Sequence, residues 1–325
     1  MRHAARVCGR FAPSPTGYVH LGNAWAFLLV WLSARAQNGR MILRVEDIDP
    51  QRSRTEFIDA LLEDMRWLGL DWDEGPDVAG PAQPYLQSLR KGHYEEALTR
   101  LDRIGVTYPC FCTRGELRNL ASAPHAEDAV VPYPGTCRRL DEAQRAVLFG
   151  AGRRAAVRLR CSAEEVSFTD ALKGEGRMRL ADCGGDFALR RSDGVISYQL
   201  AVTVDDAAMG ITEVVRGRDI LHSTPGQIVL QRLLGYATPR YAHIPLLLDN
   251  NGERLAKRHK GLALRSLRQQ GADARRVVGL LSRMAGLNPR EQPVKPGDLL
   301  PRFTLARLPE HDQRVTEDDV RRLVA

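Results

Sequence analysis

The chain has 325 residues, of which 43% are hydrophobic and 27% charged, and its formal net charge is +7 at pH 7. No apolar run approaches the roughly 18 residues of a transmembrane helix, and no secretory signal precedes the first predicted strand. The six cysteines are not spaced as a disulfide framework, so we expect a cytoplasmic protein with no membrane association. The net positive charge is compatible with a polyanionic partner but does not identify one.

The first part of the chain alternates strand and helix signals. Apolar runs predict strands at 6–11 and 41–45, and helical spacing of apolar residues predicts helices at 24–37 and 54–68. This order predicts an α/β fold, in which a Rossmann-type parallel sheet is connected by crossover helices.

The rest of the chain predicts an insertion and a helical end. A loop is expected at 71–84, a helix at 87–104, a return of the sheet at 194–204 and a helix at 228–234. From residue 261 the chain is expected to be helical and arginine-rich. We therefore expect a catalytic domain in two halves, at 1–107 and 191–264, with an insertion at 108–190 between them. A C-terminal helical segment is expected at 265–325.

The most informative motif is RFAPSPTGYVHLGN at residues 10–23. A strand runs into a loop with Pro and Gly, and the loop leads directly into a helix. A helix N-terminus presents unpaired N–H groups, which favours phosphate binding. Gly17 and Gly22 allow close approach of a ligand, and His20 is a candidate donor to a phosphate oxygen.

Further motifs follow in the order of a known family. Together with the first motif, these segments resemble the signatures of the class I glutamyl-tRNA synthetases. They are RVEDID at 44–49, YQLAVTVDD at 198–206, VRGRDI at 215–220 and RLAKR at 254–258. The resemblance implies the class I synthetase fold and ATP-dependent activation of L-glutamate. In the last motif, Ala256 and Arg258 depart from the family's usual residues, which leaves the details of this ATP loop open.

The resemblance also implies roles for individual residues. ATP would contact His20, Gly22, Asn23 and Lys257, with His20 and Lys257 as the catalytic residues. Lys257 would neutralise the departing pyrophosphate. Glutamate would be held by Arg10, Ser14, Glu46, Tyr198 and Arg216, because an arginine fork suits a carboxylate. We expect Mg²⁺ to arrive with ATP, and Asp47 and Asp49 to be caps or ion-pair partners rather than metal ligands.

The cysteines suggest a metal site in the insertion. Cys110 and Cys112, with Cys137 farther along, fit a closed tetrahedral zinc site that lacks one ligand. In the truncated members that this chain resembles, the glutamyl-Q tRNA(Asp) synthetases, a tyrosine completes the set, which corresponds to Tyr133. His125 is the rival fourth ligand. We expect one structural Zn²⁺ per chain.

The expected function follows from the resemblance and from how soon the chain ends after Arg258. We expect no anticodon-binding domain, and transfer of glutamate to queuosine, the modified wobble base of tRNA(Asp), by a monomeric enzyme. Two alternatives stay open: a minimal enzyme that charges a tRNA 3′ end, and an inactive synthetase-like protein that binds RNA. The arginines of the C-terminal helices could follow RNA phosphates or form a solvated face.

Overall fold

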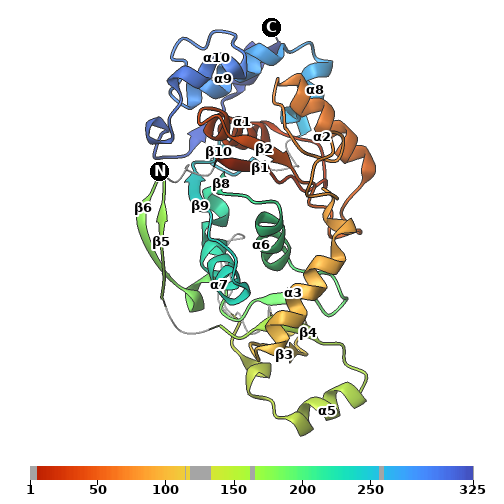
Figure 1. Cartoon of the computed structure of the whole chain (residues 1–325). Helices are drawn as coiled ribbons and strands as arrows, with labels where there is room; N and C mark the ends of the chain where they lie inside the picture. Colours follow the sequence, from red (N-terminus) through yellow and green to blue (C-terminus); the bar gives the residue numbers. More distant parts are fainter. Residues whose placement is uncertain (1–5, 114, 118–132, 162–164, 256–259, 325) are drawn as a thin grey trace.

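The computed structural model describes residues 6–113, 115–117, 133–161, 165–255 and 260–324 (Figure 1). Its centre is built from two pairs of parallel strands. β1 (Cys8–Phe11) pairs with β2 (Arg40–Leu43), and β8 (Glu213–Gly217) pairs with β9 (Arg240–Ile244). The N–H of Thr212 donates to the carbonyl of Cys8 at 3.0 Å, which joins the two pairs. The predicted α/β class with a parallel sheet is confirmed.

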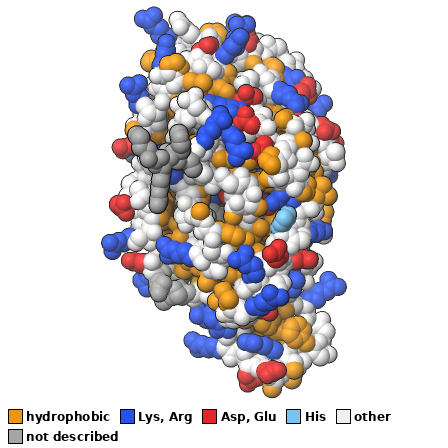
Figure 2. Space-filling model, in the orientation of Figure 1, with side chains coloured by type: hydrophobic (Ala, Val, Ile, Leu, Met, Phe, Trp, Pro, Cys, Tyr) orange, Lys and Arg blue, Asp and Glu red, His pale blue; other side chains and the backbone are white. Residues whose placement is uncertain are grey.

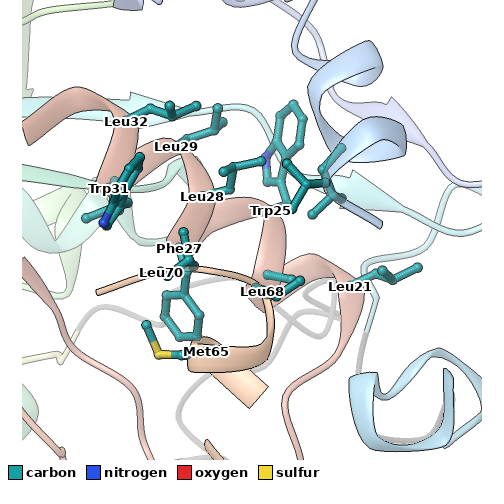
Figure 3. Close-up of a cluster of buried hydrophobic side chains, with 14 of the residues drawn as sticks. Leu21, Trp25, Phe27, Leu28, Leu29, Trp31, Leu32, Met65, Leu68 and Leu70 are labelled. Atoms are coloured by element: carbon teal, nitrogen blue, oxygen red, sulfur yellow. The ribbon is translucent and has the colours of Figure 1, made fainter. Parts of the chain in front are cut away.

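Crossover helices connect the strands within each pair. α1 (Leu21–Arg35) links β1 to β2, and α7 (Thr224–Leu234) links β8 to β9. α1 is apolar around most of its circumference because it is enclosed by the sheet, the C-terminal helices and α2 (Thr55–Trp67). Its side chains pack there against Met65, Leu68 and Leu70 (Figure 3). A helix enclosed on all sides is expected to lack a polar face.

Two predicted elements need correction, and the first is the segment at 194–204. Residues 194–204 were expected to return to the sheet, but α6 (Tyr198–Ala208) occupies most of this range and the next central strand, β8, begins only at Glu213. Val202, Thr203 and Val204 favour a strand by their β-branched side chains. The Ser197 hydroxyl instead caps a helix by accepting from the N–H of Leu200, and burial of that helix overrides the propensity.

A second correction concerns 87–104. The segment is not one helix, because the short turn η1 (Gln87–Leu89) is followed at Lys91 by α3 (Lys91–Arg103). The break lies at Arg90, whose buried side chain donates to Asp205 at 2.6 Å. α3 and α6 pack together below the central strands in Figure 1.

Between α3 and α6 the chain forms smaller antiparallel sheets. β3 (Thr107–Cys110), β4 (Ala156–Leu159) and β7 (Ala188–Arg190) form one sheet, with α5 (Glu142–Gly150) at its far end. β5 (Glu165–Asp170) and β6 (Gly174–Arg179) form a hairpin that joins the central sheet where Asp170 pairs with Tyr241 of β9.

The C-terminal part is helical, as predicted, with one strand that was not. It contains α8 (Leu264–Gln269), α9 (Ala274–Met284), the single turn α10 (Pro296–Leu299) and α11 (Glu317–Val324). The unpredicted β11 (Gln313–Arg314) pairs in parallel with β10 (Leu247–Leu248), which follows β9 in the chain. No helix in the described ranges is both long enough and apolar enough to cross a bilayer.

Candidate active site

A cleft of about 910 Å³ opens where β1 and β8 end and α1 begins. Its lining comes from the loop at 12–20, from the ends of these strands and from residues 252–255. Eight of the predicted substrate-binding residues line it: Arg10, Ser14, His20, Gly22, Asn23, Glu46, Tyr198 and Arg216. Lys257, the ninth, lies outside the described residues. Motifs far apart in the sequence thus meet in one cleft.

His20 caps the N-terminus of α1. Its Nδ1 accepts from the backbone N–H groups of Gly22 at 3.1 Å and Asn23 at 3.4 Å, and the side-chain oxygen of Asn23 accepts from the backbone N–H of His20. The predicted open N–H groups at this helix start are therefore partly used by the His20 ring. A Cβ on Gly22 would lie 3.0 Å from Cε1 of this ring, so glycine permits the contact.

The described residues on either side of 256–259 lie at the same cleft as the His20 loop or against that loop. Arg254 forms an ion pair with Asp219, and Leu255 lines the cleft. After the undescribed residues 256–259, Ala263 forms a β-bridge with His20, and the N–H of Leu264 donates to the carbonyl of Val19 at 2.8 Å. The end of this segment after residue 259 is thereby anchored to the His20 loop, and the end before residue 256 is held by Asp219.

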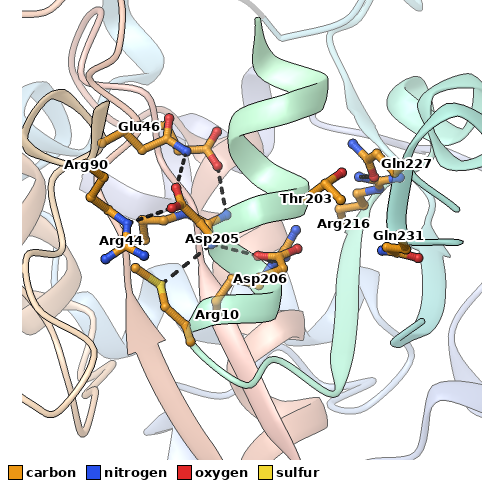
Figure 4. Close-up of polar contacts among 12 residues, drawn as sticks. Arg10, Arg44, Glu46, Arg90, Thr203, Asp205, Asp206, Arg216, Gln227 and Gln231 are labelled. Carbon is orange, nitrogen blue, oxygen red and sulfur yellow. Dashed lines mark hydrogen bonds and ion pairs between the residues drawn. The ribbon is translucent and has the colours of Figure 1, made fainter. Parts of the chain in front are cut away.

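A buried network of charges supports the wall of the cleft (Figure 4). Arg44 is 0% exposed and donates to Glu46 at 3.0 Å and to Asp206 at 2.7 Å. Arg10 contacts the same Asp206 through its Nε at 3.3 Å. Burial opposes the charge of Arg44, but Asp206, Glu46 and Asp205 outweigh it and raise its pKa. Arg10 and Glu46 are therefore held from behind by groups that do not line the cleft.

The two acidic residues of α6 anchor different parts of this network. Burial by itself raises the pKa of Asp206, but the guanidinium groups of Arg10 and Arg44 outweigh it and lower that pKa. Asp205 accepts from Arg90, Gln87 and Tyr94 at 2.6, 2.8 and 2.9 Å. Sequence reasoning gave no role to Arg44, Asp205 or Asp206, although all three lie inside the quoted motifs.

Arg216 lies near the end of β8 and is 6% exposed. Its Nε donates to His243 at 3.0 Å, its Nη1 to Gln227 at 2.8 Å and its Nη2 to Thr224 at 2.8 Å. These partners are neutral in their usual forms, and no carboxylate within the described ranges contacts the guanidinium. A buried cation held by neutral groups provides a binding position for an anion.

Other predicted residues take the following positions. Ser14 lies exposed in the loop, and Tyr198, the first residue of α6, is 37% exposed at the cleft. Asp47 accepts from the backbone and hydroxyl of Ser88 at 2.9 and 2.6 Å. Asp49 pairs with Arg191 at 2.8 Å. The prediction that the two aspartates serve as caps or ion-pair partners agrees with these contacts.

The cysteine cluster is a second candidate site, separate from the cleft. The sulfurs of Cys110, Cys112 and Cys137 lie within 4.8 Å of one another. The Tyr133 hydroxyl lies 3.3 Å from the Cys110 sulfur and 3.7 Å from that of Cys112, and it accepts from the N–H of Cys137 at 2.8 Å. Burial raises the pKa of Cys112 to about 12. His125, the rival ligand, lies outside the described residues.

Comparison with known proteins places this arrangement in a family. The family described as tRNA synthetases class I (E and Q), catalytic domain, matches residues 6–293. A glutamyl-Q tRNA(Asp) synthetase of Nitratidesulfovibrio vulgaris is 53% identical over 93% of this chain and 94% of its own length. One from Symbiobacterium thermophilum is 50% identical over 97% of each chain.

A solved structure agrees with these matches. The glutamate-tRNA synthetase of Elizabethkingia anophelis is similar to this chain with a TM-score of 0.83 and 25% identity, over 98% of this chain and 70% of that one. The chain therefore belongs to the class I tRNA synthetases of the glutamyl and glutaminyl type, in the family of the glutamyl-Q tRNA(Asp) synthetases.

Proposed function

We propose that the chain activates L-glutamate with ATP and transfers it to the queuosine base of tRNA(Asp). The relatives with 46–53% identity carry the name of this activity and match nearly their full length. The first half of the proposal rests on the charged side chains that line the cleft. Two buried arginines and one buried carboxylate lie where β1, β2 and β8 end.

This set is complementary to glutamate, which has two carboxylates and one ammonium group. Arg10 and Arg216, which are 4% and 6% exposed, would each take a carboxylate. Glu46 would take the ammonium group, with Ser14 and Tyr198 as neutral hydrogen-bonding partners. Burial raises the pKa of Glu46, and an ammonium group beside it would favour the ionised form.

The ATP end of the cleft is assigned to the His20 loop. Because Nδ1 of His20 accepts from the start of α1, a neutral ring would carry its proton on Nε2, where it can donate to a phosphate oxygen. The glutamate α-carboxylate would attack the α-phosphorus, forming glutamyl-adenylate as the bond to pyrophosphate breaks. His20 and Lys257 would stabilise the charge on pyrophosphate, with Gly22 and Asn23 beside the nucleotide and Mg²⁺ carried by ATP.

We also propose one structural zinc ion held by Cys110, Cys112, Tyr133 and Cys137. Three converging sulfurs with a hydroxyl beside them fit a closed four-coordinate site. Bound zinc would displace the thiol protons and stabilise the segment around β3 and β4. No position is left open for substrate, so the metal would take no part in the reaction.

The RNA side rests on the relatives' names and on charge. Lys and Arg side chains lie over the whole face drawn in Figure 2, from the C-terminal helices at the top to α5 at the bottom, with acidic side chains between them. This distribution suits a polyanion without marking one narrow path. We propose a monomeric cytoplasmic enzyme, since ATP and tRNA are cytoplasmic substrates.

Two assays test the proposal. ATP–pyrophosphate exchange without tRNA should depend on glutamate, and Arg216→Ala should abolish it while leaving ATP binding intact. Exchange at background level in the wild type would favour an inactive RNA-binding protein. After transfer of labelled glutamate, ribonuclease fragments locate the ester: label on the anticodon stem-loop supports the proposal, and label on the 3′ fragment supports the minimal charging enzyme instead.

A further inference from the structure

The Arg216 guanidinium is held by a series of buried polar groups behind the cleft wall. Its Nε lies 3.0 Å from Nε2 of His243, and Nδ1 of His243 lies 2.6 Å from Oδ2 of Asp170. His243 is 0% exposed and Asp170 is 2% exposed. They come from β9 and β5, and neither lines the cleft. Neither residue can therefore touch a substrate in the cleft, and the His243 ring reaches the cleft lining through Arg216, directly and by way of the Thr224 hydroxyl, which lies 3.1 Å from Nε2 of His243.

Two contacts determine which ring nitrogen of His243 carries the proton. The Nε–H of an arginine is always a donor, so Nε2 of His243 must accept. An ionised carboxylate only accepts, so Nδ1 must be protonated and donate to Asp170. Burial lowers the pKa of His243, which keeps the ring neutral. Burial raises the pKa of Asp170, but hydrogen bonds from His243 and from backbone N–H groups outweigh it and lower that pKa.

The other contacts of Arg216 leave its guanidinium little freedom. Gln227 and Thr224 accept from its two terminal nitrogens, each at 2.8 Å. Its Cζ lies 5.4 Å from the centre of the Tyr241 ring, which stacks on His243. An arginine has five N–H groups, and these three bonds leave one on each terminal nitrogen for a ligand. This fixed orientation is what two-point binding of a carboxylate requires.

We propose that Asp170 and His243 are positioning residues for the amino acid: Asp170 fixes the tautomer of His243, and His243 orients Arg216 toward the substrate carboxylate. The inference rests on the proposed glutamate site. The competing explanation is that the pair only stabilises the junction of β5, β9 and β8. The two explanations differ in what they predict for the KM of glutamate when the protein remains folded.

Two substitutions at His243 separate these explanations. In His243→Asn the amide reaches the position of Nδ1, so it keeps the bond to Asp170 and loses the acceptor for Arg216. In His243→Gln the amide oxygen reaches the position of Nε2 and keeps that acceptor. In glutamate-dependent exchange, we expect the Asn variant to raise the KM for glutamate about tenfold to a hundredfold. The kcat and the KM for ATP should change little, and the Gln variant should restore much of the KM.

Asp170→Asn provides a second test, because an asparagine no longer requires a proton on Nδ1 of His243. The KM for glutamate should rise in this variant as well. The inference would be overturned if His243→Asn and His243→Gln had the same KM for glutamate. It would also be overturned if both of these variants kept the wild-type KM for glutamate and the wild-type melting temperature, which would leave a structural role.

A spectroscopic measurement does not depend on activity. In protein labelled with ¹⁵N-histidine, the signals that disappear in His243→Gln belong to His243, and the account predicts a neutral ring protonated at Nδ1. A ring protonated at Nε2, or at both nitrogens, at neutral pH would overturn the inference even if the variants are inactive. Wild-type protein without glutamate-dependent exchange would instead contradict the proposed function, and the tautomer would still be measurable.

Discussion

Arg44 donates to Asp206 across 2.7 Å, and this bond joins the two halves of the proposed glutamate pocket. Arg44 lies just after β2 and also holds Glu46, whereas Asp206 lies on α6 and also contacts Arg10. Neither Arg44 nor Asp206 lines the cleft, but each contacts a residue that does. The positions of the proposed ammonium and carboxylate partners therefore depend on one buried ion pair.

Arg44→Met should be strongly destabilising. It leaves Glu46, Asp205 and Asp206 buried with one cation fewer, and breaking a buried pair in this way costs about 3–5 kcal/mol. Urea unfolding measures the change. The control is Arg54→Met, because Arg54 pairs with Glu56 at 3.5 Å on the surface, and an exposed pair contributes less than about 1 kcal/mol. Equal losses in the two variants would contradict the role given to Arg44.

Gly22→Ala should lower activity more than stability. The added Cβ would lie 3.0 and 3.1 Å from Cε1 and Nδ1 of His20, so the ring must move away from the proposed phosphate position. A displacement of about 1 Å at a reacting group can cost about a hundredfold in rate. The contact here requires the ring to move by a few tenths of an ångström, so we expect a smaller loss in kcat for exchange, of about tenfold. The matched control is Gly92→Ala, near the start of α3, where a Cβ meets nothing within 4 Å. A Gly22 variant as active as this control would argue against the assigned position of His20.

The stability of the protein should fall as the pH drops below about 6.5, the usual pKa of histidine. Burial lowers the pKa of His243 in the folded state, so in this window the unfolded chain binds a proton that the folded chain does not. By linkage, this contribution to the free energy of unfolding is fully present above the pKa of His243 in the unfolded chain. It is lost as the pH falls toward the lower pKa of His243 in the folded protein. Urea unfolding of the wild type and His243→Gln at pH 7.5 and 5.5 tests this. The stability difference between them should shrink at the lower pH, and a constant difference would contradict the assignment.

Removal of zinc should destabilise the segment around β3. We expect the isolated protein to contain one zinc ion and Cys110→Ser to lose most of it, with a lower melting temperature; a chelator should have the same effect on the wild type. Tyr133→Phe tests the fourth ligand and should weaken binding without abolishing it. Cys183→Ser is the control, since this thiol lies outside the cluster of Cys110, Cys112 and Cys137. Full zinc content in Cys110→Ser would rule out the proposed ligand set.

Much of the central sheet could be predicted because its signals are local. β1, α1 and β2 each follow from an apolar run bounded by a clear turn, and the structure shifts their ends by only a few residues. α6 was missed because its β-branched residues have a strand preference that burial on a helix overrides. β11 was missed because a two-residue strand has almost no pattern, and it forms only through pairing with β10.

The residues of the candidate site could also be predicted from the sequence only in part. Residues that line the cleft, such as Arg10 and Arg216, lie in motifs that can be read along the chain. The groups that hold them could not be assigned from sequence: Asp206 is 196 residues from Arg10 along the chain, and Asp170 is 73 residues from His243. Which carboxylate meets which cation is decided by folding.

The most direct test of the central claim is transfer of labelled glutamate to tRNA(Asp) prepared with and without queuosine, at one fixed salt concentration, with tRNA(Glu) alongside. The account predicts label only on the tRNA(Asp) that carries queuosine. Label on tRNA(Glu), or equal label on both forms of tRNA(Asp), would contradict it.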